Sequence, residues 1–487
     1  MGDSMAQGFK NGGVYRTDLS FPAILARSFN PPVEFETPVF TAQTGIPINM
    51  EMLVRGLQDE FGDEITWNEY LNAGAHIYRT LRRIKNYWEG HKIPLQVERD
   101  QPYHNQGIWG FSNSDAWMIH EEFCRNFIKN NPPSYSVFSI LPDHAMYTTA
   151  RLVLNPELTP TFEHHSMIDN VKWLHQNGGV ENLISSLGHN NIVGAVTNLK
   201  IAYSEKHDLN TTHSNRTCTV FRPEHFKIET ENLYRKIAEI DIPRVFVSTI
   251  PYVTIPPAIR GVNNDKSKPR KGYFDYYSRF WIWDEDFNPD KHPHLTKEDA
   301  ITLDQHVDQY NVIIREAAEK YGFHVVPIAK HVQDTARRRL GADNVRAFPP
   351  AFIKALRANE KTAYLVDEFG RTRLSTDYIR LHEDTLKLDR GGIFSLDGLH
   401  PSTIGYGLIA NIYKMSMENA GVRFGGSIDW DHIIQSETLV SDPPILLNDL
   451  RFLLRFLSLG NGERFTTLGR NILQQILEMF SSQPKMD

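Results

Sequence analysis

The sequence predicts a mixed α/β fold built around a parallel sheet. Short runs rich in apolar and β-branched residues at 182–185, 244–248 and 323–326 have the length of buried strands. Amphipathic helices are expected between these runs, and the clearest of them covers 296–321. Strands that alternate with helices are typical of βαβ units, which assemble into parallel sheets.

The helix predicted over 296–321 has the strongest local signals. Thr296 and Asp299 have the spacing of a capping pair, and Gly322 is a typical helix stop. Apolar residues recur between them at steps of four and three, at Leu303, Val307, Tyr310, Ile314 and Ala317. A further helix is expected from about Ser402 to Ala420.

Length and composition limit the class of protein. The chain has 487 residues, 40% of them hydrophobic, which is enough for one large domain with an appendage. A formal net charge of -7 argues against a nucleic-acid partner, because such proteins usually carry a basic excess. Two cysteines, Cys124 and Cys218, are too few for a disulfide framework. No run of about 18 apolar residues predicts a membrane span.

Changes in composition suggest where the chain divides. We expect a catalytic domain over residues 1–425, with an insertion over about 85–175 that is rich in Asn, Pro, His and Trp and holds short helices. A helical extension is expected over 426–487. Its apolar residues fall at helical spacing, at Leu446, Leu450, Leu453, Leu454, Leu457, Ile472, Ile476 and Leu477.

Two short motifs carry the chemistry. The chain opens with Gly2-Asp3-Ser4, and Asp397-Gly398-Leu399-His400 lies just before the helix that begins near Ser402. A serine hydroxyl is a weak nucleophile until a neighbouring base removes its proton. An imidazole does this best when a carboxylate fixes its tautomer and stabilises its cation. Ser4 is therefore the candidate nucleophile, His400 the base and Asp397 the residue that orients it.

Two further stretches supply candidate oxyanion donors. Asn190 follows the strand predicted at 182–185, where its side-chain amide can donate to a developing oxyanion. Gly74 follows a short extended run at 65–67, and a glycine lets a ligand approach a backbone N–H closely. With the backbone N–H of Ser4, the oxyanion hole would have three donors.

In this order, the motifs resemble the SGNH hydrolases, also called the GDSL esterase/lipase family. The four blocks of that family are similar to Gly2-Asp3-Ser4, Asn72-Ala73-Gly74-Ala75, Gly188-His189-Asn190 and Asp397-Gly398-Leu399-His400. The resemblance covers roughly residues 2–420. It implies a flavodoxin-like, three-layer α/β/α sandwich with the site at the carboxyl ends of its parallel strands. It also implies an acyl-enzyme on Ser4, with no cofactor. We also expect no metal site.

Two departures from the family pattern have consequences. Asn191 stands where the family has Asp, and we expect that position to be structural. In the family an apolar strand runs into Gly-Asp-Ser, whereas only Met1 precedes Gly2 here. We therefore expect the first strand to be missing, truncated or replaced by another segment. A lost export signal would leave the compartment undefined.

Other sequence patterns are interpreted as structural. Gly405-Tyr406-Gly407-Leu408-Ile409-Ala410 matches a dinucleotide fingerprint but follows no strand, and small residues that let a helix pack closely on the sheet explain it. No G-x-S-x-G elbow surrounds Ser4, which disfavours an α/β-hydrolase fold. Histidines gather at His164-His165 and His292-Pro293-His294, but no HExxH helix accompanies them.

The sequence thus predicts a serine esterase or lipase whose partner is a small-molecule or lipid ester. A carbohydrate esterase or an acyltransferase of the same family is an alternative. A non-catalytic scaffold on the same fold is another alternative, because the first strand of the family's sheet is expected to be missing or truncated. Amphipathic C-terminal helices leave room for weak contact with a lipid surface.

Overall fold

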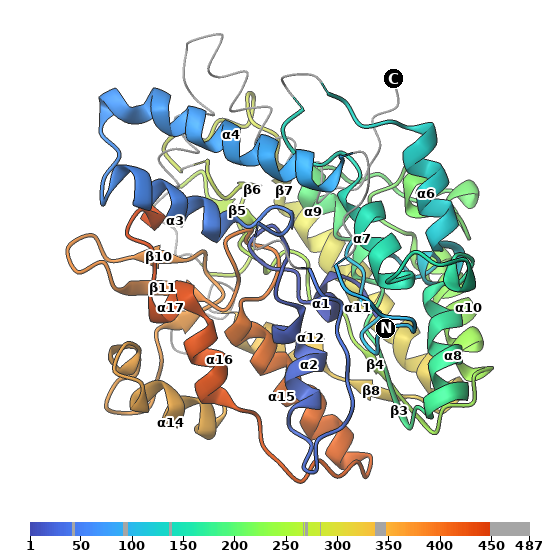
Figure 1. Cartoon of the computed structure of the whole chain (residues 1–487). Coiled ribbons are helices and arrows are strands. Elements are labelled where there is room, and N and C mark those ends of the chain that lie inside the picture. The colour runs from blue at the N-terminus through green and yellow to red at the C-terminus, as the bar shows by residue number, and fades with distance from the viewer. Residues whose placement is uncertain are drawn as a thin grey trace.

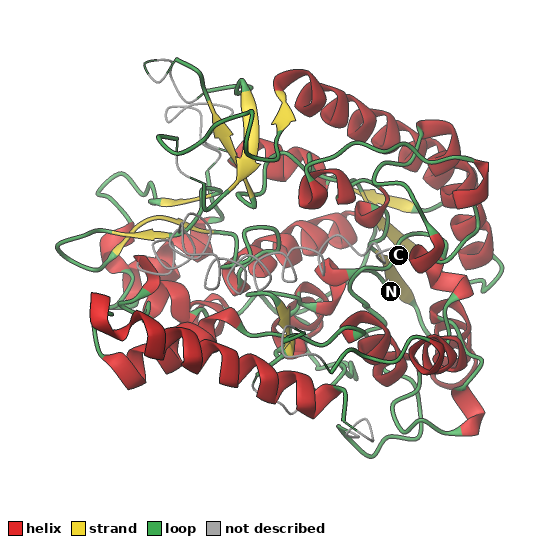
Figure 2. Ribbon diagram, turned by 90° about the horizontal axis from the view of Figure 1, so that it is seen from above, coloured by secondary structure: helices red, strands yellow, loops and turns green. Residues whose placement is uncertain are grey.

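The computed structural model describes residues 1–40, 44–90, 96–135, 139–265, 267, 271–282, 284–336 and 347–448. Its fold is mixed α/β, with short strands in separate small sheets among many helices and loops (Figures 1 and 2). The amphipathic helices expected beyond residue 448 lie outside the described residues. None of the described helices has the length and apolar character that crossing a membrane requires.

The helices are α1 (Ser4–Gln7), α2 (Phe21–Ala26), α3 (Met50–Phe61), α4 (Tyr70–Trp88), α5 (Asp115–Met118), α6 (Glu121–Asn130), α7 (Ala145–Leu154), α8 (Met167–Gly178), α9 (Gly194–Asn198), α10 (Pro223–Ala238), α11 (Lys297–Tyr321), α12 (Ile328–Thr335), α14 (Pro350–Ala358), α15 (Thr403–Asn419), α16 (Trp430–Ser436) and α17 (Thr438–Ser441). The strands are β1 (Gly13–Val14), β2 (Ile46–Pro47), β3 (Asn182–Ser185), β4 (Arg244–Ser248), β5 (Ile259–Val262), β6 (Tyr276–Arg279), β7 (Leu295–Thr296), β8 (His324–Val326), β9 (Leu374–Ser375), β10 (Arg380–Leu381) and β11 (Leu388–Gly392).

The three strands predicted from the apolar runs form one parallel sheet in the order β3-β4-β8. Asn182 pairs with Arg244, and Phe246 pairs with His324. The intervening helix α11 starts with the predicted capping box of Thr296 and Asp299 and ends at Gly322 in a left-handed conformation. The strands, this helix and the parallel pairing are therefore confirmed.

The first three residues extend this sheet by one short segment. Gly2 forms parallel bridges to Ser186 on one side and to Gly107 on the other. The Met1 ammonium donates to the Ile184 carbonyl (2.8 Å), and the Asp3 N–H donates to the Ser186 carbonyl (3.1 Å). The stretch 85–175 does hold short helices, and through Gly107 it also pairs with the beginning of the chain.

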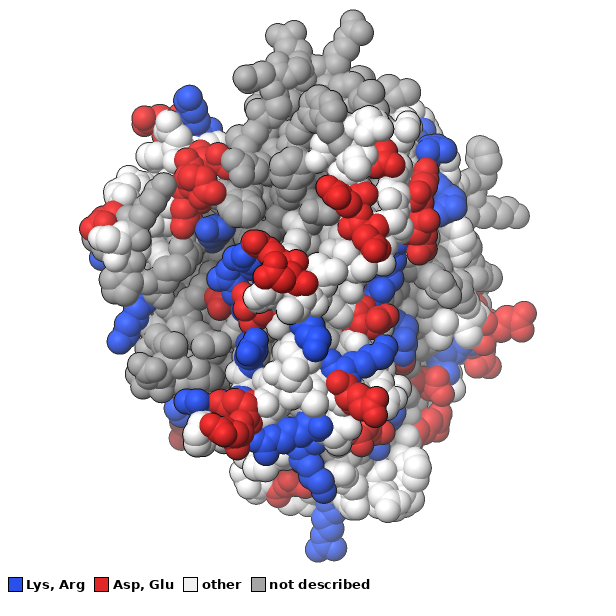
Figure 3. Space-filling view, turned by 90° about the vertical axis from the view of Figure 1, so that its left-hand side faces the viewer, with Lys and Arg blue, Asp and Glu red and all other residues white. Residues whose placement is uncertain are grey.

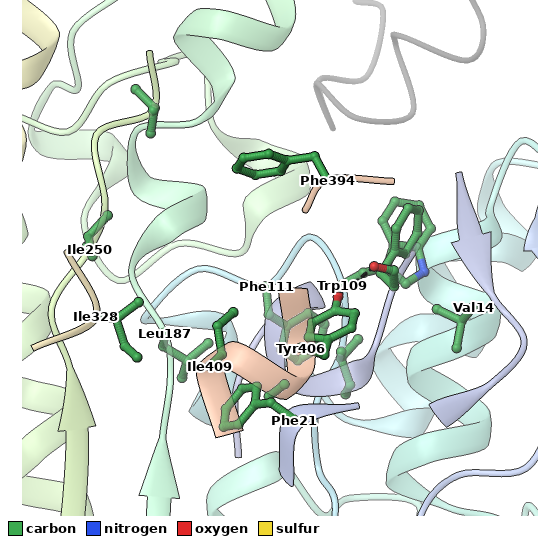
Figure 4. Close-up of a cluster of buried hydrophobic side chains, with 14 of the residues drawn as sticks. Val14, Phe21, Trp109, Phe111, Leu187, Ile250, Ile328, Phe394, Tyr406 and Ile409 are labelled. Carbon is green, nitrogen blue, oxygen red and sulfur yellow. Dashed lines mark hydrogen bonds between the residues drawn. The ribbon is translucent and has the colours of Figure 1, made fainter. Parts of the chain in front are cut away.

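Helix α15 packs beside the carboxyl ends of the parallel strands. Figure 4 shows buried side chains from the ends of β3 and β4 and from the start of α12 beside a residue of α15: Leu187, Ile250, Ile328 and Ile409. Two glycines bring α15 close to its neighbours. A Cβ on Gly405 would lie 2.4 Å from the Ile393 carbonyl oxygen, and one on Gly407 would lie 2.9 Å from Trp430. A close approach is thus present at both glycines, but the partners are α16 and a loop, whereas the prediction was close packing on the sheet.

The prediction of an extended run at 65–67 is wrong for its last residue, Trp67. Trp67–Glu69 forms a 3-10 helix that leads directly into α4, so Gly74 lies inside a helix. A capping box explains the difference, because Thr66 and Glu69 satisfy each other's backbone N–H groups. The Thr-x-x-Glu spacing was the signal for a helix start.

We predict that Gly2→Ala destabilises the fold by about 1–3 kcal/mol, the usual cost of overpacking a core. An added Cβ would lie 2.6 Å from the Ala6 Cβ and 2.8 Å from the Ser186 carbonyl oxygen. Gly74→Ala is the matched control. A Cβ there meets nothing within 4 Å, so alanine should stabilise α4 by about 0.5–1 kcal/mol. Urea unfolding of both variants measures the difference, and equal effects would contradict the packing at Gly2.

Candidate active site

A cavity of about 640 Å³ collects the candidate residues at one place. Ser4, Asn190 and His400 all line it, although they are far apart in the sequence. Most of its remaining wall is apolar and comes from the loop after β4, from α12, from the segment leading into α14, and from α15. The polar candidates therefore share the wall of one largely apolar chamber.

Ser4 owes its position to the preceding aspartate. The Asp3 carboxylate caps α1 by accepting a hydrogen bond from the Met5 N–H (3.0 Å), and the helix ends at Gly8 with φ of 85°. Ser4 is the first residue of α1, so its backbone N–H has no partner within the helix. Its side chain is 8% exposed and lines the cavity.

Asp397 and His400 form the pair that the spacing predicted. Oδ2 of Asp397 lies 3.3 Å from Nδ1 of His400. The other carboxylate oxygen accepts the N–H groups of Leu399 and His400, both at 2.8 Å. The Gly12 N–H donates to Oδ2 at 3.0 Å. The carboxylate is thus held on both oxygens, and the imidazole ring packs against Phe9 in a tilted arrangement, with ring centroids 4.4 Å apart.

The electrostatics of this pair suit a base that gains a proton. Burial of the Asp397 carboxyl by itself raises its pKa. The nearby His400 and the hydrogen bonds from residues 399 and 400 together lower the pKa by more than burial raises it, so the pKa lies below its usual value. Asp397 is therefore a carboxylate at neutral pH. A fixed negative charge beside Nδ1 stabilises the imidazolium that forms when His400 takes a proton.

Asn190 lies in a turn that a glycine makes possible. Gly188, with φ of 108°, ends the segment after β3 and starts the 3-10 helix His189–Asn191. The Asn190 amide donates to the Phe111 carbonyl (2.8 Å), which fixes the orientation of the side chain at the cavity wall. Asn191 is buried and contacts Asn113 and Glu229, in line with the expected structural role.

The structure does not bring Gly74 to this cavity. Gly74 is half-buried within α4, and it is not one of the residues that line the chamber. A backbone N–H in the interior of a helix donates to the carbonyl one turn earlier, so it is not available to an oxyanion. Gly74 therefore has no place in the candidate oxyanion hole.

Two residues at the cavity were missed by the sequence reasoning. Gly110, with φ of 81°, lines the chamber beside Trp109, whose N–H donates to the Gln7 side chain (2.9 Å). His189 also lines it, and its Nδ1 donates to the Asp3 carboxylate at 2.8 Å. The Trp-Gly pair in a glycine-rich stretch was the available signal for Gly110. Nothing in the local sequence indicated that His189 would contact Asp3.

Comparisons with known proteins add little at this point. No protein family matches the sequence, and no curated protein matches it. Among solved structures, the chain is similar to LAE5, an alpha/beta hydrolase enzyme from the metagenome of Lake Arreo, Spain. The two are 14% identical, with 52% of this chain and 67% of the other chain covered and a TM-score of 0.22. A likeness at that level carries no argument about the site.

The depressed pKa of Asp397 predicts a pH-dependent contribution to stability. A carboxyl whose pKa is lower in the folded state stabilises the fold above its unfolded pKa, about 3.9, and loses that contribution as the pH falls through the folded value. The gap in unfolding free energy between wild type and Asp397→Asn should therefore be largest above about pH 5 and shrink below about pH 4. Denaturant unfolding from pH 3 to 7 measures it.

Asp384→Asn is the control for that comparison, because Asp384 is exposed. Its unfolding free energy should follow wild type at every pH. A gap for Asp397→Asn that stays constant down to pH 3 would show that the ionised carboxylate does not stabilise the fold.

Proposed function

We propose that the protein is a serine esterase that hydrolyses carboxylic esters through an acyl-enzyme on Ser4. The observation that carries the proposal is the meeting of Ser4 with the Asp397–His400 pair at one cavity. These groups come from opposite ends of the described chain, and they are the three types of side chain that nucleophilic acyl transfer needs. Neither packing nor solubility requires them to meet.

In the proposed reaction, His400 takes the proton of Ser4 as the hydroxyl attacks the acyl carbon. Asp397 holds the imidazole in the tautomer that can accept this proton and stabilises the resulting cation. The same proton then passes to the departing alcohol. Water, deprotonated by His400, attacks the acyl-enzyme and releases the acid, which regenerates Ser4.

The proposed oxyanion hole contains the Ser4 N–H and the Asn190 amide, with Gly110 in place of Gly74. Gly110 lines the chamber, and the structure records no intramolecular hydrogen bond from its N–H within the described residues. A preorganised donor that is not otherwise engaged is the kind of group that stabilises a developing negative charge. Asn190 keeps a second amide hydrogen beyond the one given to Phe111.

The finer fold assignment is also a proposal. With the bridges of Gly2 included, the parallel segments run in the order Gly107, Gly2, β3, β4, β8. Numbered along the chain, that is 2-1-3-4-5, the flavodoxin-like order. It supports a three-layer α/β/α sandwich of the SGNH type. The division into 1–425 and 426–487 stays a prediction, and Trp430 beyond that boundary lines the cavity.

The apolar wall favours an ester with an apolar acyl or alkyl group over a sugar ester. Along α15, the lining residues lie on one side of the helix, at Gly405, Leu408, Ile409, Asn411, Ile412 and Met415, and all but Asn411 are apolar. Ten residues of helix separate the first from the last, which is about 15 Å.

Hydrolysis and acyl transfer differ only in whether water or an alcohol resolves the acyl-enzyme. Lipid-surface contact also stays a prediction; positive and negative side chains are mixed on the face shown in Figure 3.

We predict that a fluorophosphonate probe labels Ser4 at one equivalent per chain and that Ser4→Ala abolishes labelling. His400→Ala should slow labelling by about 10⁶-fold, because the hydroxyl then lacks its base. Mass spectrometry of the adduct locates the site. His331→Ala is the matched control, since His331 also lines the cavity but lies on α12.

An unlabelled wild-type chain that melts cooperatively would contradict the enzyme proposal and favour the scaffold alternative. Equal rates for His400→Ala and His331→Ala would contradict the role of His400 alone.

We further predict that kcat/KM rises with acyl length across a series of p-nitrophenyl esters from acetate to longer acids. Leu408→Trp should reduce kcat/KM for the longer esters at least tenfold while changing acetate hydrolysis little, because the indole fills the chamber along α15. Glu418→Trp is the control, on the exposed face of the same helix. Uniform loss on all esters with Leu408→Trp would indicate that the acyl chain does not follow α15.

A further inference from the structure

A second constellation of potential ligands lies outside the cavity, at the start of α6. One ligand atom from each of His120, Glu122 and His164 lies within 4.8 Å of the other two. None of these residues lines the candidate active site. The segment 163–166 runs into α8, and Figure 1 shows α6 and α8 on the same side of the molecule. The two parts of the cluster are far apart in the sequence, so spacing alone could not reveal it.

Backbone contacts hold the two segments of the cluster together. His120 forms an antiparallel bridge with Ser166, and the Glu122 N–H donates to the Glu163 carbonyl at 2.9 Å. His120 is also the N-cap of α6, with its Nδ1 accepting the Phe123 N–H at 3.3 Å. The side chains are thus presented from paired backbone, which fixes their separation better than independent loops would.

One of the distances between ligand atoms already suits a tetrahedral ion. Nδ1 of His164 lies 3.1 Å from Oε2 of Glu122. Two ligands at about 2.0–2.1 Å from a tetrahedral zinc ion are about 3.3–3.4 Å apart, so this pair needs almost no adjustment. Nδ1 of His120 lies 3.2 Å from the Glu163 carbonyl, which leaves Nε2 for a metal. Metal-bound imidazoles commonly donate their other N–H to such a carbonyl.

We infer that His120, Glu122 and His164 form a zinc site, with water completing the coordination. Two imidazoles and one carboxylate are the ligand types that Zn²⁺ prefers over Ca²⁺ or Mg²⁺. Binding through Nε2 would select the His120 tautomer whose Nδ1–H donates to Glu163, and the Phe123 N–H would then lose its bond to Nδ1. Glu163 would stay outside the coordination sphere, since Arg125 holds its carboxylate at 2.9 Å. The ion would tie the segment before α8 to the start of α6.

This inference departs from the expectation of no metal in the sequence analysis. That expectation rested on the absence of an HExxH helix, which is a motif for ligands on a single element. Here the ligands come from two elements joined by backbone pairing. The site is separate from the proposed ester chemistry, so its test does not depend on catalysis.

The test is titration of the metal-free full chain with Zn²⁺ by calorimetry. Wild type should bind one equivalent through this site, with release of protons. Affinity should fall at least tenfold in Glu122→Gln and in His164→Ala, because each removes one ligand. Zinc should also raise the melting temperature of wild type and not that of His164→Ala, since only a ligand bound to the folded state stabilises it.

His432→Ala, which removes an exposed histidine on α16, is the control and should bind zinc like wild type. His164 is suited to the test because its side chain is 64% exposed and its loss should not impair folding. The absence of zinc uptake by wild type would overturn the inference. So would equal affinity in wild type, Glu122→Gln and His164→Ala, which would assign the uptake to other histidines.

Discussion

The pairing of residues 1–3 with the parallel sheet is the constraint on which the candidate site depends. Gly2 lies between Ser186 and Gly107, and a side chain at that position would collide with the Ser186 carbonyl and with Ala6. The segment therefore enters at the carboxyl end of β3 with little freedom, and α1 begins one residue later. Because open α/β sheets place their sites at the carboxyl ends of the strands, this single register delivers Ser4 to the cavity.

A second set of contacts ties the acid–base loop to the same segment. The Asn11 N–H donates to the Ser395 hydroxyl, and the Leu396 N–H donates back to the Asn11 side chain, both at 3.0 Å. The Gly12 N–H adds a third hydrogen bond between the two segments by donating to the Asp397 carboxylate. The residues just after the proposed nucleophile therefore position the loop that carries its proposed base. Each group is buried, so losing one bond would leave an unpaired polar atom that costs about 1–3 kcal/mol. The proposed nucleophile and its proposed base are thus held by one connected network.

The sequence predicts this arrangement well where the signals are local. The strand runs, the capping box at Thr296 and the Asp397–His400 spacing are short-range patterns, and all three are present. The prediction that Gly74 is an oxyanion donor was wrong, because a four-residue block was interpreted without the Thr66–Glu69 capping box that starts a helix ahead of it. Gly110 and the His189–Asp3 contact were missed for a different reason. They depend on which distant segments the sheet brings together, and one sequence does not show those pairings.

The apolar chamber also determines how strongly the polar groups on its wall can act. Asp397 stays ionised although it is fully buried, because hydrogen bonds and the imidazole offset the desolvation of its charge. The proposed oxyanion donors are the N–H groups of Ser4 and Gly110 and the Asn190 amide. In a medium of low polarity, these donors would act on a developing oxyanion more strongly than they would in water. An apolar acyl group that fills the chamber would exclude water and strengthen this effect further. The part of the substrate that does not react would therefore contribute to the rate as well as to binding, which is the expected behaviour of remote binding energy in catalysis.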